Sequence, residues 1–160
     1  MILGIALSSF AVLHVAISLV AIVSGFAALL MGPLGSRLAA ALTALFLAST
    51  LATSVTGFMF PVARLAPGHI TGALTLVALV PTLLALYRHR LAGPWRRIYA
   101  VGATAGLYLN VFIAVLHAFG KMTVLHPLAP KLASPPLLAT QLVVLALFVA
   151  LFILAAKRPH

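Results

Sequence analysis

Two histidines lie inside long apolar segments of this chain, where an ionisable side chain is costly and usually serves a function. His14 lies in the first such segment and His117 in the fourth. Asn110 precedes His117 by two helical turns, so the two residues share one face of a helix. Imidazole is an axial ligand of haem iron, and imidazole and amide groups also form hydrogen bonds with carbonyl oxygens. These residue types and spacings therefore indicate a polar site between helices.

The sequence also limits the chemistry of such a site. Its 160 residues include no aspartate and no glutamate. This excludes carboxylate-ligated metals, paired-carboxylate hydrolysis and a Ser–His–Asp triad built from the chain's own side chains. The sequence has no cysteine either, so it forms no disulfide, thiolate ligand or redox thiol.

A haem b held by His14 and His117 is the most specific hypothesis. The segments that carry these residues run antiparallel, and helical side chains lean toward the helix N-terminus, which brings the two rings toward the same depth. Lys121, one turn beyond His117, and Arg64 in a neighbouring loop would pair with the two haem propionates. Haem iron would then have two imidazole ligands from facing helices.

A quinone site is the close alternative, in which Asn110, His117 or Tyr108 donates a hydrogen bond to a carbonyl oxygen. Another interpretation involves no cofactor. His14 and His117 would then bond hydroxyls or carbonyls on neighbouring helices and hold the bundle together. Interhelical hydrogen bonds of this kind contribute about 0.6 kcal/mol on average.

A copper site near one surface is a further alternative, because thioether and imidazole groups are ligands that suit Cu(I). Its candidate ligands are Met59, His69, Met122 and His126. His69 lies at the end of an apolar segment, where interfacial water would also explain it. Transport of a small solute is the last alternative considered, although proton relays in transporters commonly use intramembrane carboxylates, which this chain lacks.

The elements that position these residues are apolar helices. Hydrophobic residues make up 64% of the chain and charged residues 6%, and the mean hydropathy is +1.27. A helix needs about 20 apolar residues to cross a bilayer, and breaks rich in Gly and Pro separate the apolar segments. We therefore predict one all-α, polytopic membrane domain over residues 1–160. Its five spans cover about 4–31, 38–60, 69–87, 97–119 and 136–156.

The distribution of cations predicts the orientation of the bundle. One end carries seven cations, namely Arg37, Arg88, Arg90, Arg96, Arg97, Lys157 and Arg158. The other end carries three, namely Arg64, Lys121 and Lys131. Because cytoplasmic loops carry the excess of Lys and Arg, we expect an outside N-terminus and a cytoplasmic C-terminus. The histidine site then lies in the outer leaflet.

The same distribution bears on partners. The formal net charge of +10 does not indicate nucleic acid, because the cations flank apolar segments and face lipid headgroups. Outer-face cations would suit an acidic patch on another membrane subunit. Helix faces rich in small residues would suit association with other subunits or with a second copy.

Two stretches carry a resemblance: residues 53–61 (TSVTGFMFP), and residues 107–112 (LYLNVF) leading to 117–119 (HAF). They resemble small bacterial integral membrane proteins that have no assigned activity. The resemblance covers most of the chain from the second span onward and implies a multi-pass protein of the bacterial inner membrane. Glutamine often stands at the position of His117 in such proteins, which implies a hydrogen-bonding role there.

Together these features predict a small inner-membrane subunit with a histidine-containing site in the outer leaflet. Electron transfer through haem b or a quinone is the most specific version of this prediction. A cofactor-free accessory or assembly subunit of a larger membrane complex is the alternative. We do not expect the chain to be an enzyme on its own.

Overall fold

The computed structural model describes residues 1–2, 4–61, 66–131 and 133–157. Within these ranges the chain is helical, and five of its helices are long and apolar enough to cross a membrane. They are α1 (Leu7–Met31), α2 (Arg37–Phe58), α3 (Pro67–Leu83), α4 (Trp95–Lys121) and α5 (Pro135–Lys157). A π-helical turn, η1 (Leu84–Arg88), extends α3, and a 3-10 turn, η2 (His126–Leu128), lies between α4 and α5. The prediction of an all-α chain with five such segments is confirmed.

When η1 is counted as part of the third segment, the helix ends differ from the predicted spans by three residues or fewer. The first segment was expected to begin at residue 4, whereas α1 begins at Leu7. Gly4 has a positive φ of 79°, and Ile2 and Ile5 pair in an isolated β-bridge. The backbone therefore turns before the helix starts, although its composition is already apolar.

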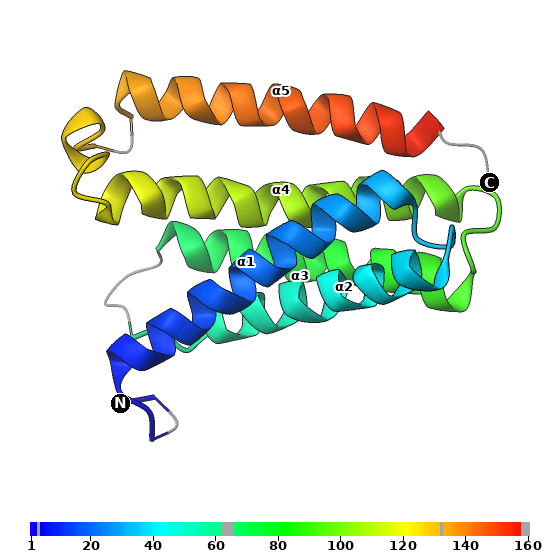
Figure 1. Cartoon of the computed structure of the whole chain (residues 1–160), viewed down its shortest axis with the longest axis horizontal. Coiled ribbons are helices and arrows are strands. Elements are labelled where there is room, and N and C mark those ends of the chain that lie inside the picture. The colour runs from blue at the N-terminus through cyan, green and yellow to red at the C-terminus, as the bar shows by residue number, and fades with distance from the viewer. Residues whose placement is uncertain (3, 62–65, 132, 158–160) are drawn as a thin grey trace.

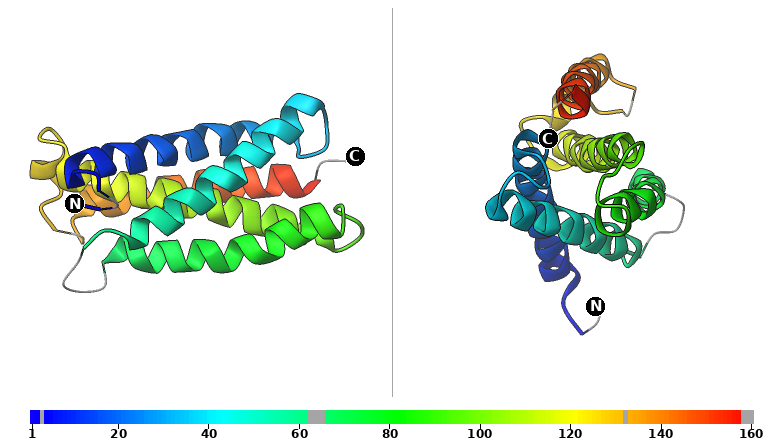
Figure 2. Two further views of the ribbon diagram at one scale, coloured as in Figure 1. Left: turned by 90° about the horizontal axis from the view of Figure 1, so that it is seen from below. Right: turned by 90° about the vertical axis from the view of Figure 1, so that its right-hand side faces the viewer.

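The helices α1, α2, α3 and α4 surround the interior of the bundle, and α5 packs on the outside of α4 (Figures 1 and 2). The helix α1 crosses α2 obliquely, so that its C-terminal half approaches α4 while its N-terminal half diverges from α4 (Figure 1). Gln141 ties α5 to α4 by donating a hydrogen bond of 3.0 Å from Nε2 to the carbonyl oxygen of Phe112.

Small residues of α1 allow this helix to approach α2 and α4 closely at one end of the bundle. A Cβ atom at Gly25 of α1 would lie 2.7 Å from Leu107 Cδ1 on α4 and 2.7 Å from Phe46 Cδ2 on α2. Phe46 and Leu107 are completely buried, and both belong to the main apolar cluster of the bundle. The helices are therefore tightly packed around Gly25, and the opposite end, where α1 diverges, is more open.

The start of α2 gives a testable prediction about stability. Ser36 precedes the helix with an extended backbone, and its Oγ accepts a hydrogen bond of 3.0 Å from the Ala39 N–H. We expect Ser36→Ala to lower the free energy of unfolding by about 1 kcal/mol, because a backbone donor of the first turn loses its partner. Titration with a denaturing detergent would measure the change. Ser36→Asp should retain most of the stability, and an equal loss in both variants would contradict the capping role.

Candidate functional site

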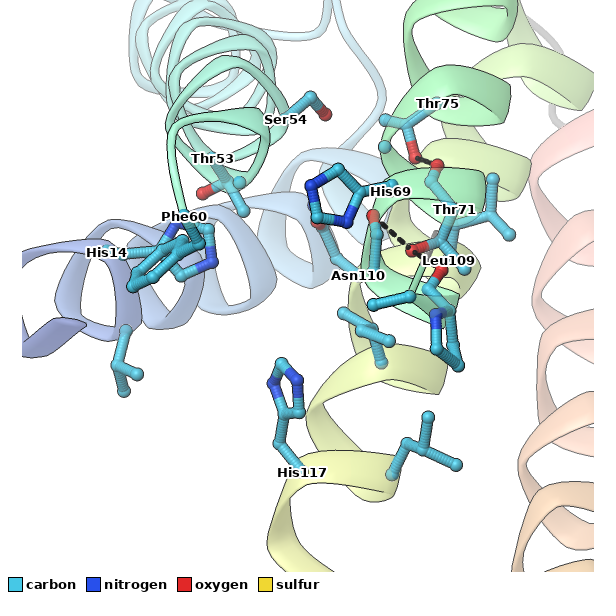
Figure 3. Close-up of a pocket in the computed structure, with 18 of the residues that line it drawn as sticks. His14, Thr53, Ser54, Phe60, His69, Thr71, Thr75, Leu109, Asn110 and His117 are labelled. Atoms are coloured by element: carbon cyan, nitrogen blue, oxygen red, sulfur yellow. Dashed lines mark hydrogen bonds between the residues drawn. The ribbon is translucent and has the colours of Figure 1, made fainter. Parts of the chain in front are cut away.

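A cavity of about 480 Å³ lies between α1, α2, α3 and α4 (Figure 3). It is formed by the N-terminal halves of α1 and α3 and the C-terminal halves of α2 and α4. His14 of α1, His69 of α3 and His117 of α4 line it, together with Asn110 and Lys121 of α4. The two histidines that the sequence singled out therefore reach one cavity, at the end of the bundle where α1 diverges from α4.

The lining of the cavity changes from largely apolar where it is exposed to polar where it is buried. Its buried polar lining residues are Thr53, Ser54, Thr71, Thr75 and Asn110. Its apolar lining residues include Ala11, Val15, Ile113 and Leu116, all of them partly or largely exposed. The side chain of Val15, for example, is 50% exposed, whereas Asn110 is 4% exposed. The cavity thus has a buried polar floor, and the exposed part of its lining is largely apolar, with His117 and Lys121 as its polar members.

The hydrogen bonds of His14 assign the position of its ring proton. Its Nδ1 lies 2.8 Å from Thr56 Oγ1 of α2. That hydroxyl already donates its own hydrogen to the carbonyl oxygen of Ala52, at 2.7 Å. With the Thr56 hydrogen on the Ala52 carbonyl, Nδ1 carries the proton of the neutral ring and donates it to Thr56. The other nitrogen, Nε2, has no hydrogen-bond partner in the described part of the chain, so its lone pair remains free.

Asn110 forms part of the cavity floor and connects α4 to α2. Its Nδ2 donates a hydrogen bond of 3.2 Å to Thr50 Oγ1. One amide N–H and the carbonyl Oδ1 have no further partner among the described residues. Because the residue is almost completely buried, these groups have little access to water and remain available to a molecule in the cavity.

The other two histidines of the cavity are less constrained. His117 is exposed, and its ring has no hydrogen bond within the described ranges. His69 packs edge-on against Phe58 with a centroid separation of 5.6 Å, and its Nδ1 is buried without a hydrogen-bond partner. The rings of His14, His69 and His117 lie around the same open space on three different helices (Figure 3). Each of them can meet a ligand from a different side.

The described residues contain no group of three or more His, Cys, Asp or Glu side chains that could hold one metal ion. The three imidazoles are therefore spread around the cavity rather than gathered at a point. This arrangement fits a larger group that contacts separate side chains better than a single bound ion.

Two residues expected at the site lie elsewhere or outside the described ranges. Tyr108 does not line the cavity. Its ring packs 5.5 Å from Phe148 of α5 and 6.0 Å from Phe112, because it precedes Asn110 by two residues, or about 200° around the helix. Donation from Tyr108 into this cavity is therefore not supported by its position. Arg64, the expected partner of a propionate, lies outside the described residues.

The four side chains of the copper alternative do not share the cavity. His69 lines it, whereas Met59, Met122 and His126 do not. Met122 follows the end of α4 and is 53% exposed, and His126 is exposed in the turn between α4 and α5. The four residues were expected near the same end of the bundle, but they do not form one site.

No protein-family model, curated protein or solved structure matches this chain. The interpretation of the cavity therefore depends on its geometry and chemistry.

Proposed function

We propose that this chain is a small membrane subunit that binds a quinone or its quinol in the cavity between α1, α2, α3 and α4. One observation carries the proposal: the cavity has a buried polar floor, while the exposed part of its lining is largely apolar. A quinone has the matching chemistry, with a polar oxygen-bearing ring and an apolar tail. Its ring would lie against the floor, while its tail would extend along the exposed apolar lining into lipid.

The polar groups of the cavity support this assignment. The free amide N–H of Asn110 can donate to a carbonyl oxygen, and the free Nε2 of His14 can accept from a hydroxyl. His117 can do either, because a neutral imidazole exchanges its donor and acceptor between two tautomers. Exchange of electrons with a partner subunit would make the chain a component of an electron-transfer complex.

The proposed location is the outer leaflet of a bacterial inner membrane. The excess of Lys and Arg at the opposite end of the bundle supports a cytoplasmic position for that end. The exposed Lys121 and Lys131 at the cavity end would then face the outside, where an acidic patch of a partner subunit would suit them.

Solvent extraction of the purified protein tests the quinone assignment. We expect chromatography of the extract to detect a quinone or its quinol, and His14→Ala to lower the bound amount about tenfold, because one hydrogen bond to a ligand hydroxyl is lost. His126→Ala is the control, since this histidine lies outside the cavity. Equal quinone content in the wild type, His14→Ala and a lipid-only extract would contradict the proposal.

Haem b is the second candidate, and the hydrogen bond of His14 favours it. Haem-ligating imidazoles commonly donate from one nitrogen to a protein oxygen while the other nitrogen binds the metal, as the Nδ1 bond to Thr56 would permit here. His117 would supply the second ligand, and Lys121 would meet a propionate. An absorption spectrum separates the candidates: a Soret band lost in both His14→Ala and His117→Ala would support haem.

A cofactor-free accessory subunit is the remaining alternative. The bond between His14 and Thr56 is also the kind of interhelical contact that such a role predicts. A colourless preparation that yields no quinone, from a protein that co-purifies with acidic membrane partners or with a second copy of itself, would favour this role.

A further inference from the structure

We propose that the cavity binds the reduced quinol more tightly than the oxidised quinone, an inference that rests on the function proposed above. The two forms differ in their oxygen atoms. A quinol has two hydroxyl groups that donate hydrogen bonds, whereas a quinone has two carbonyl groups that only accept them. A cavity whose fixed polar groups are mainly acceptors therefore favours the quinol.

His14 is the first of these fixed acceptors. While the Thr56 hydroxyl donates to the Ala52 carbonyl, it accepts from the imidazole, and this arrangement keeps the proton of the neutral ring on Nδ1. Nε2 is left as an acceptor. Reversing the tautomer would require the Thr56 hydroxyl to turn away from the Ala52 carbonyl and donate to Nδ1 instead, across 2.8 Å. His14 is therefore matched to a hydroxyl of the ligand and mismatched to a carbonyl.

Three hydroxyl groups of the polar lining also donate their hydrogen to a backbone carbonyl. Ser54 Oγ donates to the Thr50 carbonyl at 2.9 Å, and Thr75 Oγ1 donates to the Thr71 carbonyl at 2.7 Å. Thr71 Oγ1 donates to the Pro67 and Gly68 carbonyls, each at 3.1 Å. Each hydroxyl has one hydrogen and uses it within its own helix, so each presents only lone pairs to a ligand.

The remaining groups of the cavity include fewer fixed donors. Thr53 of the floor has a hydroxyl that contacts Ser18 Oγ at 3.4 Å and donates to no carbonyl among the described residues, so it can donate to a ligand. Asn110 offers one free N–H but also a free carbonyl oxygen. Lys121 donates only, and it is exposed at the end of α4, away from the buried floor. His69 and His117 have no hydrogen bond that fixes a tautomer among the described residues, so they can serve either form of the ligand. The groups with a fixed role at depth are therefore predominantly acceptors.

A preference of this kind also changes the redox behaviour of the bound ligand. Tighter binding of the quinol stabilises the reduced member of the couple, so the midpoint potential of the bound couple becomes more positive. For this two-electron couple, a tenfold preference corresponds to about 30 mV. The site would then favour reduction of the quinone that it holds.

Binding of both forms of one ligand tests the inference. The full-length protein in mild detergent would be titrated with a benzoquinone that carries a ten-carbon tail, and with the same molecule kept reduced by dithionite. Isothermal titration calorimetry would give both dissociation constants. We expect the quinol to bind about three- to tenfold more tightly, the range that one hydrogen bond accounts for.

A variant of Thr56 tests the cause. Thr56→Val removes the acceptor that holds the His14 proton on Nδ1, so the ring can donate from Nε2 and the ratio of the two constants should fall toward one. Thr140→Val is the matched control, because the Thr140 hydroxyl also donates to a carbonyl one turn earlier, but on α5 away from the cavity. Circular dichroism would show that both variants remain folded.

The outcomes separate the inference from the proposed function. If the wild-type protein binds the quinone as tightly as the quinol, the inference is wrong, while quinone binding itself stands. An undiminished preference in Thr56→Val would also overturn it, because the proton position of His14 would not be its source. If neither form binds, the proposed function fails together with the inference.

Discussion

Gly102→Ala is expected to lower the free energy of unfolding by about 3 kcal/mol, the upper part of the range for overpacked interiors. Gly102 lies on α4 where this helix packs against α3. An added Cβ would overlap the Oγ1 of Thr82 and lie 3.0 Å from the carbonyl oxygen of Ala78. The hydroxyl of Thr82 already donates to that same carbonyl. Since backbone is part of the contact, the helices must separate to accept one methyl group.

Two further variants make the prediction specific. Gly120→Ala places the same methyl group near the end of the same helix, where it meets no neighbouring side chain or other helix within 4 Å, and should leave the stability unchanged or slightly raised. Thr82→Ala combined with Gly102→Ala removes the hydroxyl from the contact and should recover part of the loss. Unfolding in a denaturing detergent, followed by circular dichroism, would measure all three. Equal stability of Gly102→Ala and Gly120→Ala would show that α3 and α4 are not in such close contact.

The five helices could be predicted from the sequence because their signal is local. Each apolar segment has the length needed to cross a bilayer, and Gly or Pro residues mark the breaks. The exact ends were harder to predict, since composition does not report backbone conformation. The segment around Gly4 is as apolar as the helix that follows, yet its positive φ and the pairing of Ile2 with Ile5 keep it out of α1.

The site was predictable within one helix but not between helices. Asn110, His117 and Lys121 recur at helical spacing, so one face of α4 was expected to carry all three, and all three line the cavity. The partner of His14 depends instead on how α1 crosses α2. The second segment offers several hydroxyls on neighbouring faces, and only the crossing geometry selects Thr56. No pattern in the sequence alone makes that choice.

His69 shows a second limit of sequence reasoning. Its place in the first turns of α3 explains why interfacial water or copper was considered for it. Whether its ring points to water or to the cavity depends on the rotation of α3 about its own axis. That rotation is set by buried residues farther along the helix, including Thr71, Thr75 and Leu79. With this packing the ring of His69 lines the cavity. The sequence had predicted only His14 and His117 at this site.

Gly57→Leu is expected to lower the affinity for a quinone-type ligand by at least about a hundredfold, or about 2.8 kcal/mol. Gly57 of α2 lines the cavity, and a Cβ placed there would meet only His14 Cε1, at 3.6 Å. A single added carbon therefore lies in van der Waals contact with His14. The remaining carbons of leucine must occupy the space of the ligand. Loss of that space should weaken binding more than loss of one hydrogen bond in His14→Ala.

The control at the same position separates occlusion from misfolding. Gly57→Ala adds the carbon that fits and should bind within about threefold of the wild type, since it removes no polar group and little volume. Both variants should be at least as stable as the wild type, because glycine is less favourable in a helix than alanine or leucine by about 1 kcal/mol. Calorimetry with the ten-carbon-tailed benzoquinone would measure binding. Unchanged affinity in a folded Gly57→Leu variant would place the ligand outside the cavity, and the assignment of His14, Asn110 and His117 to its binding would then be wrong.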